Sequence, residues 1–209
     1  MEQKALTIDS PKQLFLSVII LLMTMTVLSA CGNSGYSKYF PEPSVGRSQE
    51  YHISVHTPSG IQTFTGIERV EGKEKINGKT YYKTVTIYQD LPGAEPDLSY
   101  ERYTNDGIYA VDTDDPQQQE YLDIPFPLEE GMSWTISDSN SQLDVFFEGV
   151  EDVYLPDKTY QDCVKLSVTG FDDGEPISME LYFAKDVGLV RDTGTYAGME
   201  YERILVSDE

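Results

Sequence analysis

Residues Ile61–Gln89 read IQTFTGIERVEGKEKINGKTYYKTVTIYQ, two runs rich in β-branched and aromatic residues on either side of Asn77-Gly78. Apolar and polar residues tend to alternate in both runs, which is typical of strands that bury one face. Asn-Gly is the preferred pair of a two-residue hairpin turn, because both positions adopt positive φ at little cost. The segment therefore predicts two antiparallel strands joined by a tight turn.

The same pattern continues along the chain. Tyr100–Thr104 and Ile108–Asp112 flank Asn105-Asp106-Gly107, a second hairpin signal, and no window carries an apolar stripe of helical period. We therefore expect an all-β fold, an antiparallel meander of about ten to twelve strands forming curved sheets, with little helix. Further candidate strands are Tyr51–His56, Tyr121–Ile124, Ser133–Asp138, Leu143–Tyr154, Cys163–Phe171, Ile177–Ala184, Leu189–Asp192 and Met199–Val206.

An internal repeat divides this β region into residues 39–125 and residues 126–209. Five pairs of segments match in order, at offsets of 79 to 81 residues: Glu68–Glu71 with Glu148–Glu151, Lys79–Val85 with Lys158–Val164, Ser99–Tyr103 with Ser178–Tyr182, Gly107–Tyr109 with Gly188–Val190, and Glu120-Tyr121 with Glu200-Tyr201. Phe40-Pro41 with Gly46 likewise matches Phe126-Pro127 with Gly131. A common strand composition rich in Tyr, Thr and Glu is the alternative explanation. We interpret the order and spacing as two β repeats.

The N-terminal region has the three parts of an export signal. Lys4 and Lys12 precede an apolar run, Phe15–Val27, which ends in Leu28-Ser29-Ala30-Cys31. This run is shorter than the roughly 20 apolar residues of a spanning helix. We interpret residues 1–30 as a signal peptide and residues 31–38, rich in Gly and Ser, as a flexible tether.

The LSAC string resembles the lipobox of bacterial lipoproteins. The resemblance implies that a diacylglycerol group is attached to Cys31 and that cleavage follows Ala30. The domain would then be lipid-anchored and extracytoplasmic, on the cell membrane or the outer membrane. The alternative is a spanning anchor in which Cys31 is an incidental thiol, and the short apolar run argues against it.

Charge restricts the partners of the domain. The chain carries a formal net charge of −21, and the two acids and two bases before Cys31 cancel. An acidic surface repels nucleic acid and anionic lipid headgroups, so we expect no nucleic-acid partner. The expected partners are the membrane, through the N-terminal lipid, and an envelope protein or a hydrophobic ligand.

Three segments resemble a group of bacterial envelope lipoproteins that has no established activity. These segments are FPLEEGMSW at Phe126–Trp134, TYQDCVK at Thr159–Lys165 and YFAKDVGLV at Tyr182–Val190. The resemblance covers the second repeat well and the first loosely. It implies a curved antiparallel sheet and supplies no catalytic or binding residue.

Candidate chemistry is sparse. His52 and His56 have a spacing that suits a metal only on a helix, and four residues of strand span about 13 Å. Cys163 has no neighbouring base in the sequence and is expected to be a small half-buried strand residue. The acidic loops Asp112–Pro116 and Phe171–Glu175 could offer oxygen ligands to calcium, but EF-hand spacing fails because Gln117 stands where glycine is required. Such acidic turns usually cap hairpins and keep edge strands soluble. We expect no catalytic, cofactor or metal site, and no enzyme.

Tyrosine is abundant, with 15 residues against a single Trp. Such residues mostly build the core, but a concave sheet lined by tyrosines could hold a ligand, and Tyr100, Tyr103, Tyr109 and Tyr121 are the first candidates. The favoured hypothesis is a non-catalytic interaction or structural module of the cell envelope. The alternative is a carrier or sensor that binds a lipid or other hydrophobic ligand in a curved β groove, with an apolar concavity of at least about 300 Å³. An envelope hydrolase ranks last, because no nucleophile or metal set is evident.

Overall fold

The computed structural model describes residues 35–91, 93–111, 119–137, 141–172 and 174–209; Cys31, the expected signal peptide and the loop Asp112–Pro116 lie outside them. Most described residues are in strands. One short 3₁₀ helix, η1 (Gly35–Tyr39), precedes them. The strands are β1 (Ser48–Thr57), β2 (Gly60–Ile76), β3 (Lys79–Gln89), β4 (Asp97–Tyr103), β5 (Gly107–Val111), β6 (Glu120–Pro125), β7 (Ser133–Ser137), β8 (Ser141–Tyr154), β9 (Thr159–Asp172), β10 (Glu175–Ala184), β11 (Gly188–Tyr196) and β12 (Met199–Asp208).

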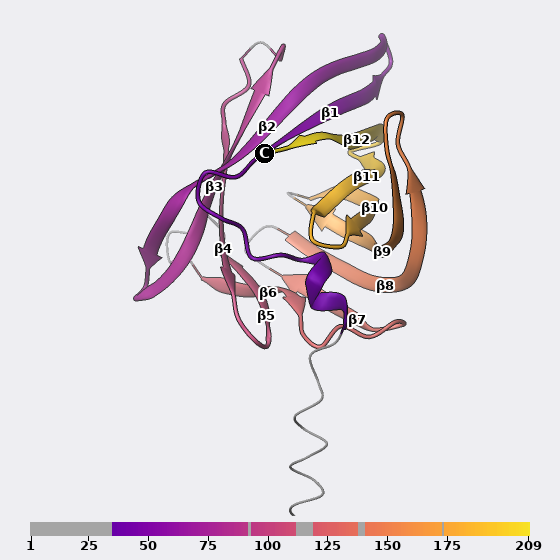
Figure 1. Cartoon of the computed structure of the whole chain (residues 1–209). Helices are drawn as coiled ribbons and strands as arrows, with labels where there is room; N and C mark the ends of the chain where they lie inside the picture. The colour runs from indigo at the N-terminus through magenta and orange to yellow at the C-terminus, as the bar shows by residue number, and fades with distance from the viewer. Residues whose placement is uncertain (1–34, 92, 112–118, 138–140, 173) are drawn as a thin grey trace, which may run out of the picture. The chain divides into compact units, whose positions relative to one another are not determined.

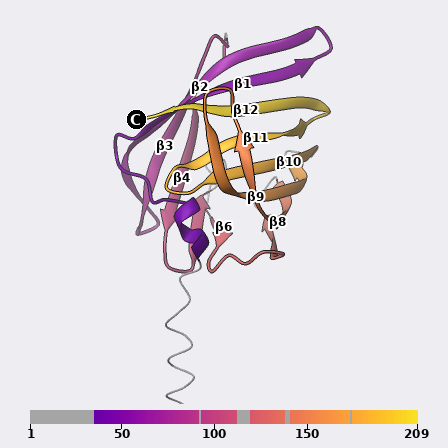
Figure 2. The ribbon, with the colours of Figure 1, turned by 45° about the vertical axis from the view of Figure 1, so that its right-hand side comes forward.

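All twelve strands belong to one antiparallel sheet with the order β6-β5-β4-β3-β2-β1-β12-β11-β10-β9-β8-β7. Each half is a six-strand meander, and the pairing of β1 with β12 joins the halves in the middle of the sheet. The sheet curls strongly, so that its two edge strands, β6 and β7, come near each other (Figures 1 and 2). The predicted all-β, curved antiparallel fold is confirmed, and the two halves share one continuous sheet.

The two halves correspond strand by strand. The segments matched in the sequence lie on the pairs β2 and β8, β3 and β9, β4 and β10, β5 and β11, and β6 and β12. The turn that enters each half also has the same hydrogen bonds. The Gly46 amide donates to the Val70 carbonyl and the Gly131 amide to the Phe147 carbonyl, both at 2.8 Å. Both glycines adopt positive φ, 93° and 82°, where glycine is favoured because it lacks Cβ.

The segment between β6 and β7 closes the gap between the two edges of the sheet. The indole Nε1 of Trp134 donates to the carbonyl of Asp123 on β6 at 2.7 Å. The Phe126 amide donates to the Asp106 carbonyl at 2.9 Å, and Leu128 is 1% exposed within the core. The FPLEEGMSW segment therefore has a structural role, which is to connect the edge strands.

The N-terminal segment, Tyr36–Gly46, crosses the opening of the curved sheet instead of hanging free (Figure 1). The Tyr36 ring lies 5.0 Å from the Phe147 ring, and Phe40 lies 4.6 Å from Phe183, centroid to centroid. The Asp186 amide donates to the Lys38 carbonyl at 2.7 Å. Within the expected tether, residues 35–38 are thus docked on the sheet, in part through the Tyr36 ring.

The buried apolar residues form two principal clusters. Phe40, Phe147 and Leu166 belong to one, and Tyr51 and Val190 belong to the other. Among the described residues, no helix has the length and apolar character that a membrane span requires.

Candidate functional site

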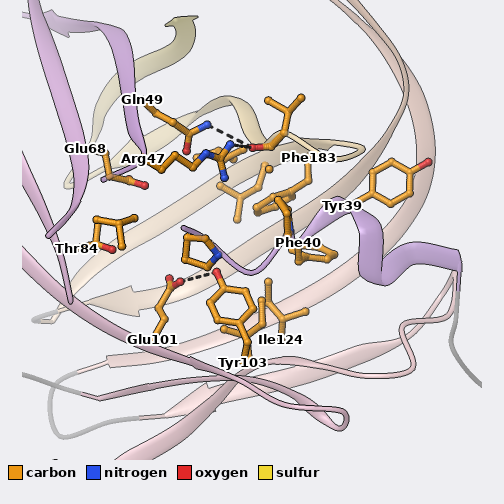
Figure 3. Close-up of a pocket in the computed structure, with 18 of the residues that line it drawn as sticks. Tyr39, Phe40, Arg47, Gln49, Glu68, Thr84, Glu101, Tyr103, Ile124 and Phe183 are labelled. Carbon is orange, nitrogen blue, oxygen red and sulfur yellow. Dashed lines mark hydrogen bonds between the residues drawn. The ribbon is translucent and has the colours of Figure 1, made fainter. Parts of the chain in front are cut away.

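A cavity of about 300 Å³ lies between the N-terminal segment and the concave face of the sheet (Figure 3). Strands of both halves and the N-terminal segment all contribute to its wall. The site therefore exists only when the whole sheet has curled and the N-terminal segment has docked.

One side of the cavity is apolar. Phe40 and Phe183 lie together on this side with Tyr39, opposite Glu68 and Glu101 (Figure 3). Further apolar lining comes from Ile108, Ile124, Leu181, Val187 and Leu189. Such a surface favours a ligand with a hydrocarbon part, since burying apolar area stabilises a complex by about 25 cal/mol per Å².

Two arginines also line the cavity, and each already has a carboxylate partner. Arg47 donates from Nε to Oδ1 of Asp208 at 2.8 Å and from a terminal nitrogen to Oδ2 at 2.9 Å. Arg203 donates from Nε to Oδ2 of Asp192 at 2.7 Å and stacks on the Tyr51 ring. Burial raises the pKa of Asp192, against the opposing effect of Arg203. Both guanidinium charges are therefore largely neutralised within the protein.

Three carboxyl groups on β2, β4 and β6 face the cavity without an ion-pair partner of their own among the described residues: Glu68, Glu101 and Asp123. Burial, reinforced by the negative charge of Asp123, raises the pKa of Glu101 to about 7, although the Tyr103 hydroxyl donates to it at 2.8 Å. Burial alone raises the pKa of Asp123 to about 6. It also raises the pKa of Glu68, and Arg203 and Arg47 oppose the shift. Glu101 and Asp123 are thus costly to ionise.

The pKa of Glu101 predicts a pH-dependent stability. A carboxyl whose pKa is higher in the folded state holds its proton better there, so the free energy of unfolding falls as pH rises from about 4.5 to about 7. Glu101→Gln removes the charge and keeps an acceptor for Tyr103. We expect this variant to gain about 2–3 kcal/mol over wild type at pH 8, with little gain at pH 4.5.

Urea unfolding at both pH values measures this difference. Glu175→Gln, at an exposed position of β10, is the matched control and should track wild type at each pH. An equal effect of Glu101→Gln at pH 4.5 and pH 8 would show that Glu101 ionises in the folded protein as it does in the unfolded chain.

Of the four tyrosines expected to line a concave face, only Tyr103 lines the cavity. Tyr100 belongs to a separate buried cluster with Tyr81, because residues three apart on β4 point to opposite faces. Tyr109 donates to Asp106 at 2.8 Å, and Tyr121 is outside the lining. The prediction that these four tyrosines line one surface is therefore wrong. The cause is the alternation of side chains along a strand.

The other candidate residues lie apart from the cavity. His52 and His56 are exposed on β1, and the described residues contain no cluster of three or more His, Cys, Asp or Glu arranged for a metal. Cys163 is fully buried, and burial raises the pKa of its thiol to about 11. The second acidic loop is described only in part, and its Asp172 accepts a hydrogen bond from Ser141.

Sequence reasoning missed the charged residues that line the cavity, namely Arg47, Glu68, Glu101, Asp123 and Arg203. Glu68 carried a usable signal. It lies between Gly66 and Val70 at two-residue spacing, which places it on the buried face of β2. A charge at a buried-face position indicates either a partner or a ligand.

Among the comparisons with known proteins, those with solved structures gave matches, and these matches concern the fold. No family model and no curated protein matches the sequence. The structure is similar to that of a protein from Parabacteroides distasonis described as a lipoprotein, with 14% identity and a TM-score of 0.50, over 82% of this chain and 98% of that chain. An exported protein of Bacteroides fragilis, described as having a YmcC-like fold, gives 14% identity and a TM-score of 0.49, over 79% and 96%. The first likeness shows that the curved-sheet fold is shared.

Proposed function

We propose that this chain is a non-catalytic, lipid-anchored envelope protein that holds a small amphipathic ligand in the cavity of its curved sheet, as a carrier or a sensor. The observation that carries the proposal is the cavity of about 300 Å³ between the sheet and the N-terminal segment. Ligand sites are concave, begin at about this size and combine apolar walls with a few polar groups. The mixed lining favours an amphipathic ligand over a wholly apolar one.

The proposed anchor rests on the sequence around Cys31, and the similar protein from P. distasonis is described as a lipoprotein. Four residue steps separate Cys31 from Gly35, and a chain of that length extends at most about 14 Å. Because residues beyond Gly35 form a wall of the cavity, anchoring and ligand binding would involve the same end of the domain.

A purely structural or interaction module explains the cavity less well. Such a module would be more stable with its interior filled, since buried carboxyls without partners are unfavourable and are retained mainly where they serve a function. Glu101 and Asp123 both line the cavity and are both shifted toward their neutral forms. A bound ligand would supply the partner that these two carboxyl groups lack.

Filling the cavity should abolish binding. Thr84 lies on β3 and lines the cavity, so Thr84→Phe would place an aromatic ring inside it. Trp134 is the single Trp of the chain and is hydrogen-bonded to the main chain of Asp123, so its fluorescence reports on the site. We expect 1-hexanol to cause a saturable change in the wild-type full chain, held in a nonionic detergent, and at least about a tenfold weaker response in Thr84→Phe.

Ile87→Phe is the matched control, because Ile87 lies on the same strand and is 50% exposed. Leu181→Phe fills the cavity from β10 and covers the case in which Thr84→Phe does not fold. Equal saturable responses in wild type and in both cavity-filling variants, each folded by circular dichroism, would rule out the cavity as the binding site.

A further inference from the structure

We propose that the ligand is an amphipathic organic cation, whose ammonium group lies against Glu101 and Asp123 and whose hydrocarbon part lies against Phe40 and Phe183. This inference rests on the proposed function and specifies the chemical class of the ligand. It follows from an imbalance of charge in the cavity, from a carboxylate of the cavity wall without a donor, and from the separation of polar and apolar walls.

The imbalance appears when each charge in and beside the cavity is assigned a partner. Asp208 neutralises Arg47 and Asp192 neutralises Arg203, through the hydrogen bonds described above. Glu101 and Asp123 then remain without a cationic partner among the described residues. The cavity therefore has an excess of negative charge, which a positively charged ligand would neutralise.

Asp123 is the strongest indication that the missing partner is a hydrogen-bond donor. Its side chain is half-buried and lines the cavity, yet no described residue donates a hydrogen bond to its carboxylate. A carboxylate that lines a cavity without a donor from the protein is a place for a donor from a ligand. Glu101 lies near enough to interact with Asp123 electrostatically, so one ammonium group could serve both.

The walls also assign an orientation to the ligand. Glu68, Thr84 and Glu101 lie on one side of the cavity, whereas Phe40 and Phe183 lie on the other (Figure 3). A molecule with an amine at one end and a hydrocarbon at the other fits both walls at once. A bare metal ion does not, since no cluster in the described part of the chain has the arrangement of three or more ligands that a metal needs.

Three probes of equal chain length separate the contribution of charge from that of hydrocarbon: hexylamine, 1-hexanol and hexanoate. Titrated at pH 8 against the full chain in nonionic detergent, with Trp134 fluorescence as the readout, hexylamine should bind about tenfold more tightly than 1-hexanol. Hexanoate should bind more weakly than 1-hexanol, because the cavity carboxylates repel it.

Asp123→Asn and Glu101→Gln should each reduce the preference for hexylamine over 1-hexanol about tenfold, whereas Glu175→Gln should keep the preference of wild type. Equal affinity of wild type for hexylamine and 1-hexanol, or tighter binding of hexanoate, would overturn the cationic ligand while leaving a binding cavity intact. If none of the three probes saturates, the proposed function itself fails, and this inference with it.

Discussion

Replacement of Cys31 by serine should abolish fatty-acid incorporation and leave the full-length precursor uncleaved. The thioether that anchors a lipoprotein forms on a cysteine sulfur, and serine offers no thiol for it. Resemblance to the lipobox implies that cleavage after Ala30 follows this modification, so both events should be lost together. Intact-mass spectrometry and labelling with radioactive palmitate measure the two events separately in the same cells.

Cys163→Ser is the matched control, because Cys163 is the only other cysteine of the chain. It is fully buried in β9, so its loss should leave lipid incorporation and cleavage as in wild type. Palmitate incorporation in Cys31→Ser that matches wild type would contradict the lipoprotein assignment and revive the spanning-anchor alternative.

Phe147→Ala should cause the largest loss of stability of any single substitution considered. Phe147 is 0% exposed, and its ring packs edge-on against Tyr36 at 5.0 Å between centroids. Deleting a buried phenylalanine ring removes its apolar burial and leaves a cavity, at a cost of about 3–5 kcal/mol. Because Tyr36 loses its contact, we also expect faster tryptic cleavage after Lys38 in the N-terminal segment.

The neighbouring residue provides the control. Phe146 is 43% exposed and points to the opposite face of β8, so Phe146→Ala should change the free energy of unfolding by about 1 kcal/mol or less. Urea denaturation of the three proteins decides the comparison. Equal losses in the two variants would mean that Phe147 is not at the centre of the core.

The sequence was most informative about local structure. Alternation around Asn77-Gly78 and around Asn105-Asp106-Gly107 located two hairpins, and in the structure Asn77 has positive φ as such a turn requires. These signals are local, because side-chain period and turn conformation depend on residues near each other in the chain. The prediction of about ten to twelve antiparallel strands succeeded for this reason.

The cavity could not be predicted in the same way. Its lining combines β1 to β6 with β10 to β12 and the N-terminal segment, and these positions meet only after the sheet curls. Sheet curvature and the docking of a Gly/Ser-containing segment are tertiary outcomes that composition does not reveal. Tyr36, Tyr39 and Phe40 pack on an apolar surface that is assembled from distant strands.

The alternation of side chains along a strand explains why the predicted tyrosine lining was wrong. Tyr100 and Tyr103 were grouped by composition, although an odd separation on one strand places them on opposite faces. Applying the period of two to charged residues as well would have identified Glu101, which shares a face with Tyr103 and accepts its hydrogen bond. Charges on buried faces are therefore the more informative signal in this chain.

Native mass spectrometry of the full chain, extracted gently from a cell-envelope fraction, tests the account most directly. We expect the wild-type protein to carry an additional small-molecule mass that is lost under denaturing conditions and is absent from Thr84→Phe. A wild-type protein that shows only the mass of the processed chain, identical in its bound state to Thr84→Phe, would contradict a ligand-binding function for the cavity.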